Sequence, residues 1–108
     1  MTWTVNYSDS AKRDLHGIRS YIAETLLEPE VAEKQVNRIM DAADVLDQQP
    51  FRHRSYDNEP WRSQGLRIKP VDNYVILYFP DEKTTTVTII RIMHGSRDID
   101  KQLSQSEE

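Results

Sequence analysis

Cysteine is absent from the 108-residue sequence, which excludes disulfide frameworks, thiolate nucleophiles and cysteine-based zinc sites. No stretch approaches 18 consecutive apolar residues, so the sequence predicts no transmembrane helix. The segment from Met1 to Tyr7 has neither the basic nor the apolar region of a secretory signal peptide. These absences predict a soluble cytoplasmic protein, and the length predicts a single domain over residues 1–108.

Charge is distributed unevenly along the chain, whose formal net charge is -4. Residues 1–50 carry a net charge of -4, residues 51–97 a net charge of +3, and residues 98–108 a net charge of -3. A basic segment of this kind is typical of a surface that meets an anionic partner. A solvated surface with chance clustering of charge gives the same pattern, so charge alone leaves both readings open.

The first half of the sequence predicts a strand and two helices. Residues Thr2 to Tyr7 alternate between apolar and polar, which indicates a short strand, and Ser8 follows as a helix N-cap. Apolar residues then recur at helical spacing in two stretches, separated by Glu28-Pro29. They are Ala11, Leu15, Ile18, Ile22 and Leu26 in the first stretch, and Ala32, Val36, Ile39, Ala43 and Leu46 in the second. This pattern predicts a helical hairpin.

The second half changes to the period of two that is typical of strands. Residues 51–64 have no clean period and are interpreted as an ordered loop. The predicted strands are Leu66–Val71, Tyr74–Phe79 and Thr84–Met93, and Asp98 to Leu103 form one or two helical turns. Three consecutive strands predict an antiparallel meander. The fold class is therefore α+β: a two-layer domain in which the helical hairpin packs on a C-terminal three-stranded meander after an N-terminal strand.

Three stretches of the sequence carry a recognisable family pattern. They are Tyr7-Ser8 with Ala11, Asp14-Leu15, Ile18 and Tyr21-Ile22; Gly65-Leu66-Arg67 through Val71 to Asn73-Tyr74-Val75-Ile76-Leu77-Tyr78; and Ile90 to Ile99. In this order and spacing, from Val5 to Leu103, they resemble the RelE/ParE superfamily of bacterial type II toxin–antitoxin toxins. The resemblance implies a β-α-α-β-β-β fold and an antitoxin partner whose C-terminal segment wraps the toxin.

The resemblance also implies an activity, which differs between the two branches of the superfamily. RelE-type members cut mRNA in the ribosomal A site, whereas ParE-type members poison DNA gyrase and are not nucleases. Ribosome-dependent mRNA cleavage is the leading prediction, with the ribosome and mRNA as partners and no metal or cofactor. A ParE-type gyrase poison, or a relative that only binds the antitoxin, is the alternative.

Cleavage at a 2′-OH needs a base, an acid and cations that stabilise the charged phosphorane. Arg67 and Lys69 match a basic pair of RelE-like enzymes, and their i, i+2 spacing places both on one sheet face. Arg97 matches the arginine of the closing motif, and His94 matches a histidine that some branches use as acid or base. We expect these four candidate catalytic residues to converge on one sheet edge.

Other residues of the basic segment complete the set of candidates. Basic and aromatic groups are interleaved at Arg52, Arg54 and Tyr56, which predicts an auxiliary RNA contact. Two positions depart from the nuclease pattern, because Val75 and Leu103 stand where many RelE-type enzymes have an arginine and a tyrosine. Each cation also has a structural interpretation, as a solvent-facing or locally paired side chain of a strand or turn.

Overall fold

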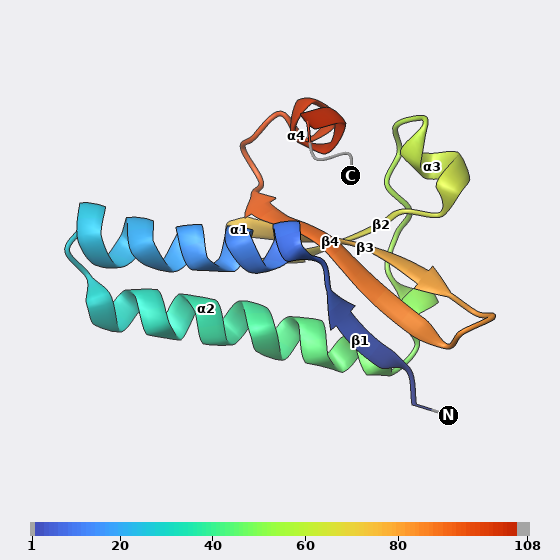
Figure 1. The fold of residues 1–108 in the computed structure, drawn as a ribbon, viewed down its shortest axis with the longest axis horizontal. Helices are drawn as coiled ribbons and strands as arrows, with labels where there is room; N and C mark the ends of the chain where they lie inside the picture. Colours follow the sequence, from blue (N-terminus) through green and yellow to red (C-terminus); the bar gives the residue numbers. More distant parts are fainter. Residues whose placement is uncertain (1, 106–108) are drawn as a thin grey trace.

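The computed structural model describes residues 2–105 and contains one mixed sheet with helices on both of its faces (Figure 1). The strands are β1 (Thr4–Tyr7), β2 (Arg67–Val71), β3 (Tyr74–Asp81) and β4 (Thr86–His94). The α-helices are α1 (Asp9–Ser20), α2 (Pro29–Asp44), α3 (Trp61–Gln64) and α4 (Ile99–Gln105). The α+β fold is confirmed, as are the helical hairpin and the C-terminal meander. Within the described residues, no helix combines the length and the apolar character that crossing a membrane requires.

The sheet has the strand order β1-β4-β3-β2. Strands β2, β3 and β4 pair antiparallel, as the predicted meander requires, and β1 joins β4 in parallel from Thr4 to Tyr7. The register between β3 and β4 shifts at Leu77 and Tyr78, which leaves Ile90 as an extra residue on β4. Such a bulge bends the strand and increases its twist. The bulge lies directly before the end of β4 that forms the candidate site.

The helical hairpin covers one face of the sheet. Ser8 caps α1, because its Oγ accepts the Ala11 N–H at 3.0 Å. A five-residue π-helix, Tyr21–Thr25, extends α1, and Pro29 begins α2. Small residues on the helices allow close packing against the sheet. The core of this face consists of Ala11, Ile39, Ala43, Leu46, Ile76, Tyr78, Val87, Ile89 and Ile92.

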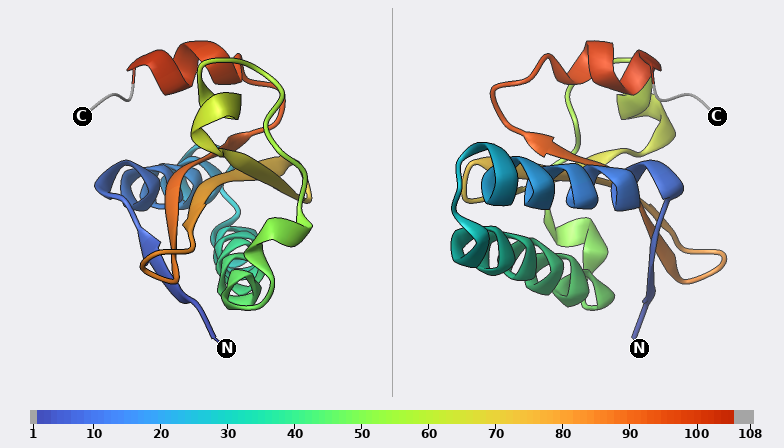
Figure 2. Two further views of the ribbon diagram at one scale, coloured as in Figure 1. Left: turned by 90° about the vertical axis from the view of Figure 1, so that its right-hand side faces the viewer. Right: turned by 60° about the vertical axis from the view of Figure 1, so that its left-hand side comes forward.

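A second, smaller core covers the opposite face of the sheet. Figure 2 shows α4 and the α3 segment on the side of the sheet away from α2. The core comprises Tyr56, Leu66, Ile68, Val75, Leu77, Met93 and Leu103. The segment 51–64, predicted as an ordered loop, contains regular structure, since it includes most of the 3-10 turn Pro50–Arg52 and all of α3. The predicted helical turns at Asp98 to Leu103 are confirmed as part of α4.

Candidate functional site

A groove of about 510 Å³ lies where α1, the end of β4 and α4 meet, and we call it the β4 groove. Its lining comes from α1, the start of β3, the last residues of β4 and the turn that follows. The residues are Asp14, Gly17, Ile18, Tyr21, Tyr74, Arg91, Ile92, Met93, His94, Ser96, Arg97 and Gln102. Two of the four candidate catalytic residues, His94 and Arg97, belong to it.

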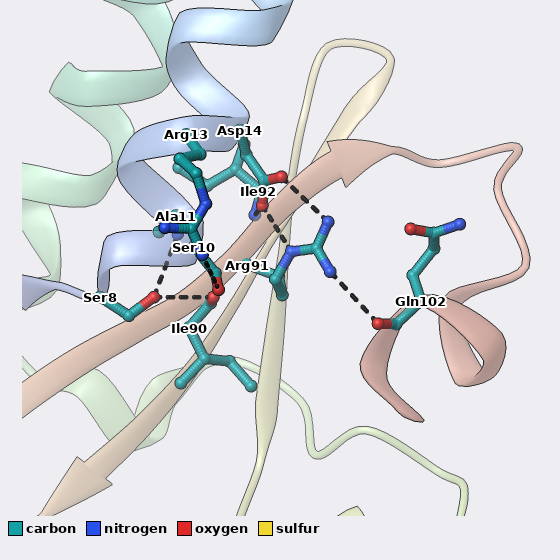
Figure 3. Close-up of polar contacts among 9 residues, drawn as sticks. All are labelled: Ser8, Ser10, Ala11, Arg13, Asp14, Ile90, Arg91, Ile92 and Gln102. Atoms are coloured by element: carbon teal, nitrogen blue, oxygen red, sulfur yellow. Dashed lines mark hydrogen bonds and ion pairs between the residues drawn. The ribbon is translucent and has the colours of Figure 1, made fainter. Parts of the chain in front are cut away.

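Arg91 and Asp14 form the polar wall of the groove (Figure 3). Arg91 Nε donates to Asp14 Oδ2 at 2.6 Å, and Arg91 Nη2 donates to Asp14 Oδ1 at 2.9 Å. The side chains are only 14% and 15% exposed, so this bidentate ion pair is largely shielded from water. Arg91 Nη1 also donates to the Gln102 carbonyl at 3.2 Å. Arg91 therefore links α1, β4 and α4.

The Asp14 carboxylate also closes the edge of β4. Strand β1 pairs with β4 only as far as Ile89, so within residues 2–105 the following part of β4 has no neighbouring strand on that side. Two side chains, from α1 and its N-cap, pair with the strand backbone where a neighbouring strand would otherwise do so. Ser8 Oγ donates to the Ile90 carbonyl at 2.9 Å, and Asp14 Oδ2 accepts the Ile92 N–H at 2.9 Å. Each backbone group paired in this way avoids the cost of a buried polar atom without a partner.

His94 lies exposed at the mouth of the β4 groove. Its Nδ1 accepts the Ser96 N–H at 3.1 Å and lies 2.7 Å from Ser96 Oγ. Because a backbone N–H can only donate, Nδ1 is the acceptor in this contact, which favours the tautomer with the proton on Nε2. The ring meets Tyr74 edge-on at 5.4 Å between centroids. With Nδ1 engaged by Ser96, Nε2 is the ring nitrogen that can donate to a ligand.

The remaining groove residues add a cation and two phenols. Arg97 is exposed in the turn after β4, where its N–H donates to the His94 carbonyl at 3.1 Å. Burial, with a smaller contribution from nearby Tyr21, raises the pKa of the Tyr74 hydroxyl above its usual value. Tyr74 therefore stays a neutral donor or acceptor. The combination of Arg97, His94 and the phenols suits the binding of a carboxylate or another anion.

Arg67 and Lys69 belong to a separate group, the β2 basic cluster, which also contains Arg52 and His53. Arg67 Nη1 donates to the carbonyls of Phe51 at 3.0 Å and His53 at 2.6 Å. Its guanidinium also lies 5.1 Å from the centroid of the Phe51 ring. These contacts hold Arg67 against the segment that precedes β2.

Lys69 is held in a similar way, because its Nζ donates to the Ala42 carbonyl of α2 at 3.2 Å. Burial, followed by the charge of Arg52, lowers the pKa of Lys69 below its usual value. Burial also lowers the pKa of His53, and the charges of Lys69, Arg52 and Arg67 act in the same direction. Arg52, Arg67 and Lys69 therefore crowd positive charge beside the outer strand of the sheet, and this charge disfavours protonation of His53.

The expected convergence of the four candidate catalytic residues is wrong. Arg67 pairs with Tyr78, whereas His94 pairs with Tyr74, which lies four positions away on β3. Strand geometry then separates their backbones by about 13 Å along the sheet and roughly 10 Å across it. Lys69 pairs with Ile76, between these two rows. The i, i+2 spacing correctly placed Arg67 and Lys69 together, but on the opposite side of β3 from His94 and Arg97.

The predicted RNA-contact residues also separate. Tyr56 is only 8% exposed, its ring meets Trp61 edge-on, and its hydroxyl donates to Asp100. The Tyr56 ring is part of the second core, so little of it is exposed for the auxiliary RNA contact that the sequence predicted. Arg54 is exposed and lies 3.4 Å from Asp57. Arg52 is exposed beside Lys69.

Comparison with known proteins shows to which family this arrangement belongs. Residues 5–99 match the model of the ParE toxin of the parDE type II toxin–antitoxin system. The chain belongs to the ParE toxin family. Among curated protein sequences, none matches the chain significantly.

Solved structures share the fold of this ParE family member. A chain from the chromosomal ParDE toxin–antitoxin system of P. aeruginosa is 21% identical, with a TM-score of 0.71 over 86% of this chain and 96% of that chain. A chain from the RelBE2 toxin–antitoxin complex of Mycobacterium tuberculosis is 26% identical, with a TM-score of 0.62 over 87% and 99%. A chain from the archaeal RelE–RelB complex of Pyrococcus horikoshii is 13% identical, with a TM-score of 0.61 over 90% and 99%.

Sequence reasoning missed one central residue of this ParE-family toxin, Asp14. Its position carried a signal, because it lies three residues after Ala11 and four before Ile18, on the apolar stripe of α1. A carboxylate on the buried face of a helix requires a partner. The partner, Arg91, follows 77 residues later, and only the tertiary fold brings the two together.

Proposed function

We propose that this ParE-family toxin acts by binding DNA gyrase and blocking it without cleaving RNA. The observation that carries this proposal is the division of the candidate catalytic residues between two separate places, the β4 groove and the β2 basic cluster. A phosphodiester-cleaving site needs its acid, base and cations around a single phosphate, within hydrogen-bond reach of the reacting atoms. The match to the ParE branch of the superfamily supports the same choice.

The hydrogen bonds that the basic side chains already make within the chain also support a binding function. Arg67 donates to two backbone carbonyls, and Lys69 to a third, so a phosphate would have to displace these contacts. In the β4 groove, the Arg91 guanidinium is occupied by Asp14 and Gln102. His94 presents an N–H donor there, and Arg97 an exposed cation. These groups fit recognition of an anionic surface group better than proton abstraction from a hydroxyl.

An antitoxin completes the proposed module. The structures from P. aeruginosa, M. tuberculosis and P. horikoshii are described as toxin–antitoxin systems or complexes. We propose that a cognate antitoxin restrains this chain in the cytoplasm by occupying the β4 groove. The anion-binding character of Arg97 and His94 suits an acidic residue in the antitoxin segment.

A supercoiling assay with purified gyrase tests the proposed function. Toxin freed from its antitoxin should inhibit supercoiling of relaxed plasmid at near-stoichiometric concentration, and premixing with antitoxin should abolish the inhibition. Toxin denatured by heat provides the matched control for non-specific effects. If gyrase is unaffected by a folded excess of toxin, the proposed function is wrong.

Ribosome-dependent mRNA cleavage is a second candidate, favoured by the crowding of Arg52, Arg67 and Lys69 in the β2 basic cluster. Such a concentration of cations suits the phosphate backbone of RNA. Primer extension on a defined mRNA in a reconstituted translation reaction tests it. Cuts in the A-site codon that require ribosomes, and that disappear with Lys69→Ala but persist with the exposed-turn control Lys83→Ala, would establish this activity.

A further inference from the structure

We propose that the tip of the helical hairpin is the surface by which the toxin docks onto its target protein. The hairpin tip consists of Leu26, Leu27 and Val31, and its matching surface on the target is an apolar pocket bordered by lysine or arginine. This inference rests on the proposed function, since it assumes a protein target. Its three residues do not line the β4 groove.

The three tip residues are large, apolar and exposed. Leu26 is 51% exposed, Leu27 77% and Val31 47%. In Figure 1, the connected ends of α1 and α2 extend well beyond the sheet, so the sheet cannot cover them. Leu26 continues the apolar stripe of α1, yet it lies in water rather than in the core. Clustered apolar residues on a projecting surface are characteristic of protein–protein contact sites.

The backbone of Leu27 provides independent support. Leu27 has a φ of 57°, in the left-handed region that glycine or asparagine adopts at the end of a helix at lower cost. Two backbone hydrogen bonds close the turn at this point, and each spans more residues than the i→i−4 bond of an α-helix. The Leu26 N–H donates to the Tyr21 carbonyl, and the Glu28 N–H donates to the Ile22 carbonyl. Neither the turn nor the core favours leucine at this position. A leucine that is both strained and exposed is explained by a contact outside the chain.

Shape and charge indicate the kind of partner. A projecting tip cannot receive a peptide segment, which binds in grooves, so the partner must be a folded protein with a pocket of its own. Glu24, Glu28 and Glu30 are exposed close to the tip in the sequence and outnumber the single nearby exposed lysine, Lys34. Two copies of the chain would bring these carboxylates together, which disfavours a homodimer through this surface. An apolar pocket with a basic border is complementary to the tip in shape and in charge.

Inhibition of gyrase supercoiling by tip variants tests this inference. Leu27→Gly removes the side chain and also removes the cost of a positive φ at a residue with a Cβ, so the variant remains folded. The combination of Leu26→Gln, Leu27→Gly and Val31→Gln removes the whole apolar surface. We expect the half-inhibitory concentration to rise at least tenfold for the triple variant. The matched control is Met40→Gln, at a 40% exposed apolar position of α2 outside the tip, and it should inhibit like the wild type.

The acidic border is tested separately. Glu28→Gln with Glu30→Gln should weaken inhibition several-fold at low salt. The effect should be much smaller at high salt, because the ions already screen the attraction between these carboxylates and the basic border of the pocket. Asp41→Asn is the matched control, since Asp41 is exposed in α2 but lies farther along the helix. Inhibition that is equally strong in these variants and in the wild type would show that charge does not guide docking.

The outcomes distinguish the docking inference from the proposed function. If the wild type inhibits gyrase and the folded triple variant inhibits equally well, the docking inference alone is wrong. If the triple variant loses antitoxin binding but still inhibits gyrase, the tip belongs to the antitoxin interface and the inference is also wrong. If the wild type fails to inhibit gyrase, the proposed function and the docking inference both fail.

Discussion

Removal of the Asp14 carboxylate should destabilise the fold strongly, because this group serves two elements at once. It accepts both Arg91 bonds, at 2.6 and 2.9 Å, and the Ile92 N–H at 2.9 Å. Asp14→Ala leaves a guanidinium that is only 14% exposed without its counter-charge and a strand N–H without its acceptor. Breaking a buried pair from one side costs about 3–5 kcal/mol, and the remaining exposure here favours the lower value.

We therefore expect Asp14→Ala to lower the free energy of unfolding by about 3 kcal/mol and Tm by roughly 15 °C. Urea denaturation at pH 7, analysed with a common m-value, measures the change. Asp41→Ala provides the control of an exposed carboxylate on α2 and should change stability by no more than about 0.5 kcal/mol. A loss below about 1 kcal/mol for Asp14→Ala would refute the role assigned to the pair.

A double-mutant cycle separates the ion pair from the bond to the strand. Arg91→Met alone leaves the Asp14 carboxylate without its cation, and Asp14→Leu alone leaves the Arg91 guanidinium without its anion. The combination of these two changes removes both charges. Because an uncompensated buried charge is the main cost, the double variant should be more stable than the sum of the single changes predicts, by about 1–3 kcal/mol. Additive losses would mean that the two residues act independently.

Three further predictions concern backbone conformation and pH. Gly65 ends α3 with a φ of 92°, so Gly65→Ala should cost about 1 kcal/mol, measurable by thermal unfolding. Leu27→Gly should leave Tm unchanged or raise it slightly, because relief of the positive φ offsets the added freedom of the unfolded chain. Burial raises the pKa of Tyr7, Tyr56 and Tyr78 to about 12, against 10.0 in the unfolded chain. The folded chain therefore keeps protons that the unfolded chain loses, so the urea midpoint should fall as pH rises from about 10 to 12.

The sequence pattern predicts the helices and strands well where one face of an element is buried. Alternation and helical spacing identified the hairpin and the three meander strands for this reason. The parallel pairing of β1 with β4 joins residues more than 80 positions apart, and no local pattern encodes it. The second core was missed because it joins strand residues, such as Leu77, to residues outside the sheet, such as Tyr56 and Leu103, and only the tertiary fold brings these together.

The candidate site shows the same division between local and non-local information. Spacing alone placed Arg67 and Lys69 on a common face, which is a local property of a strand. Their position relative to His94 depends on the register of β2 on β3 and of β3 on β4, which the sequence does not display. Residues that match a family motif in the sequence can therefore still lie at separate places on the sheet.

The outer edge of β2 bears on how an antitoxin segment could bind. The Leu66 N–H donates to the Trp61 carbonyl at 3.1 Å, and the Ile68 N–H donates to the Arg54 carbonyl at 3.1 Å. Pro70 is the next residue whose backbone faces the outer edge of β2, and proline has no N–H. A strand added along β2 would therefore find no free donor from residues 66 to 70, and the β4 edge beyond Ile89 is filled by Ser8 and Asp14. Strand addition at these edges is disfavoured, which leaves the β4 groove as the better binding place for the proposed antitoxin.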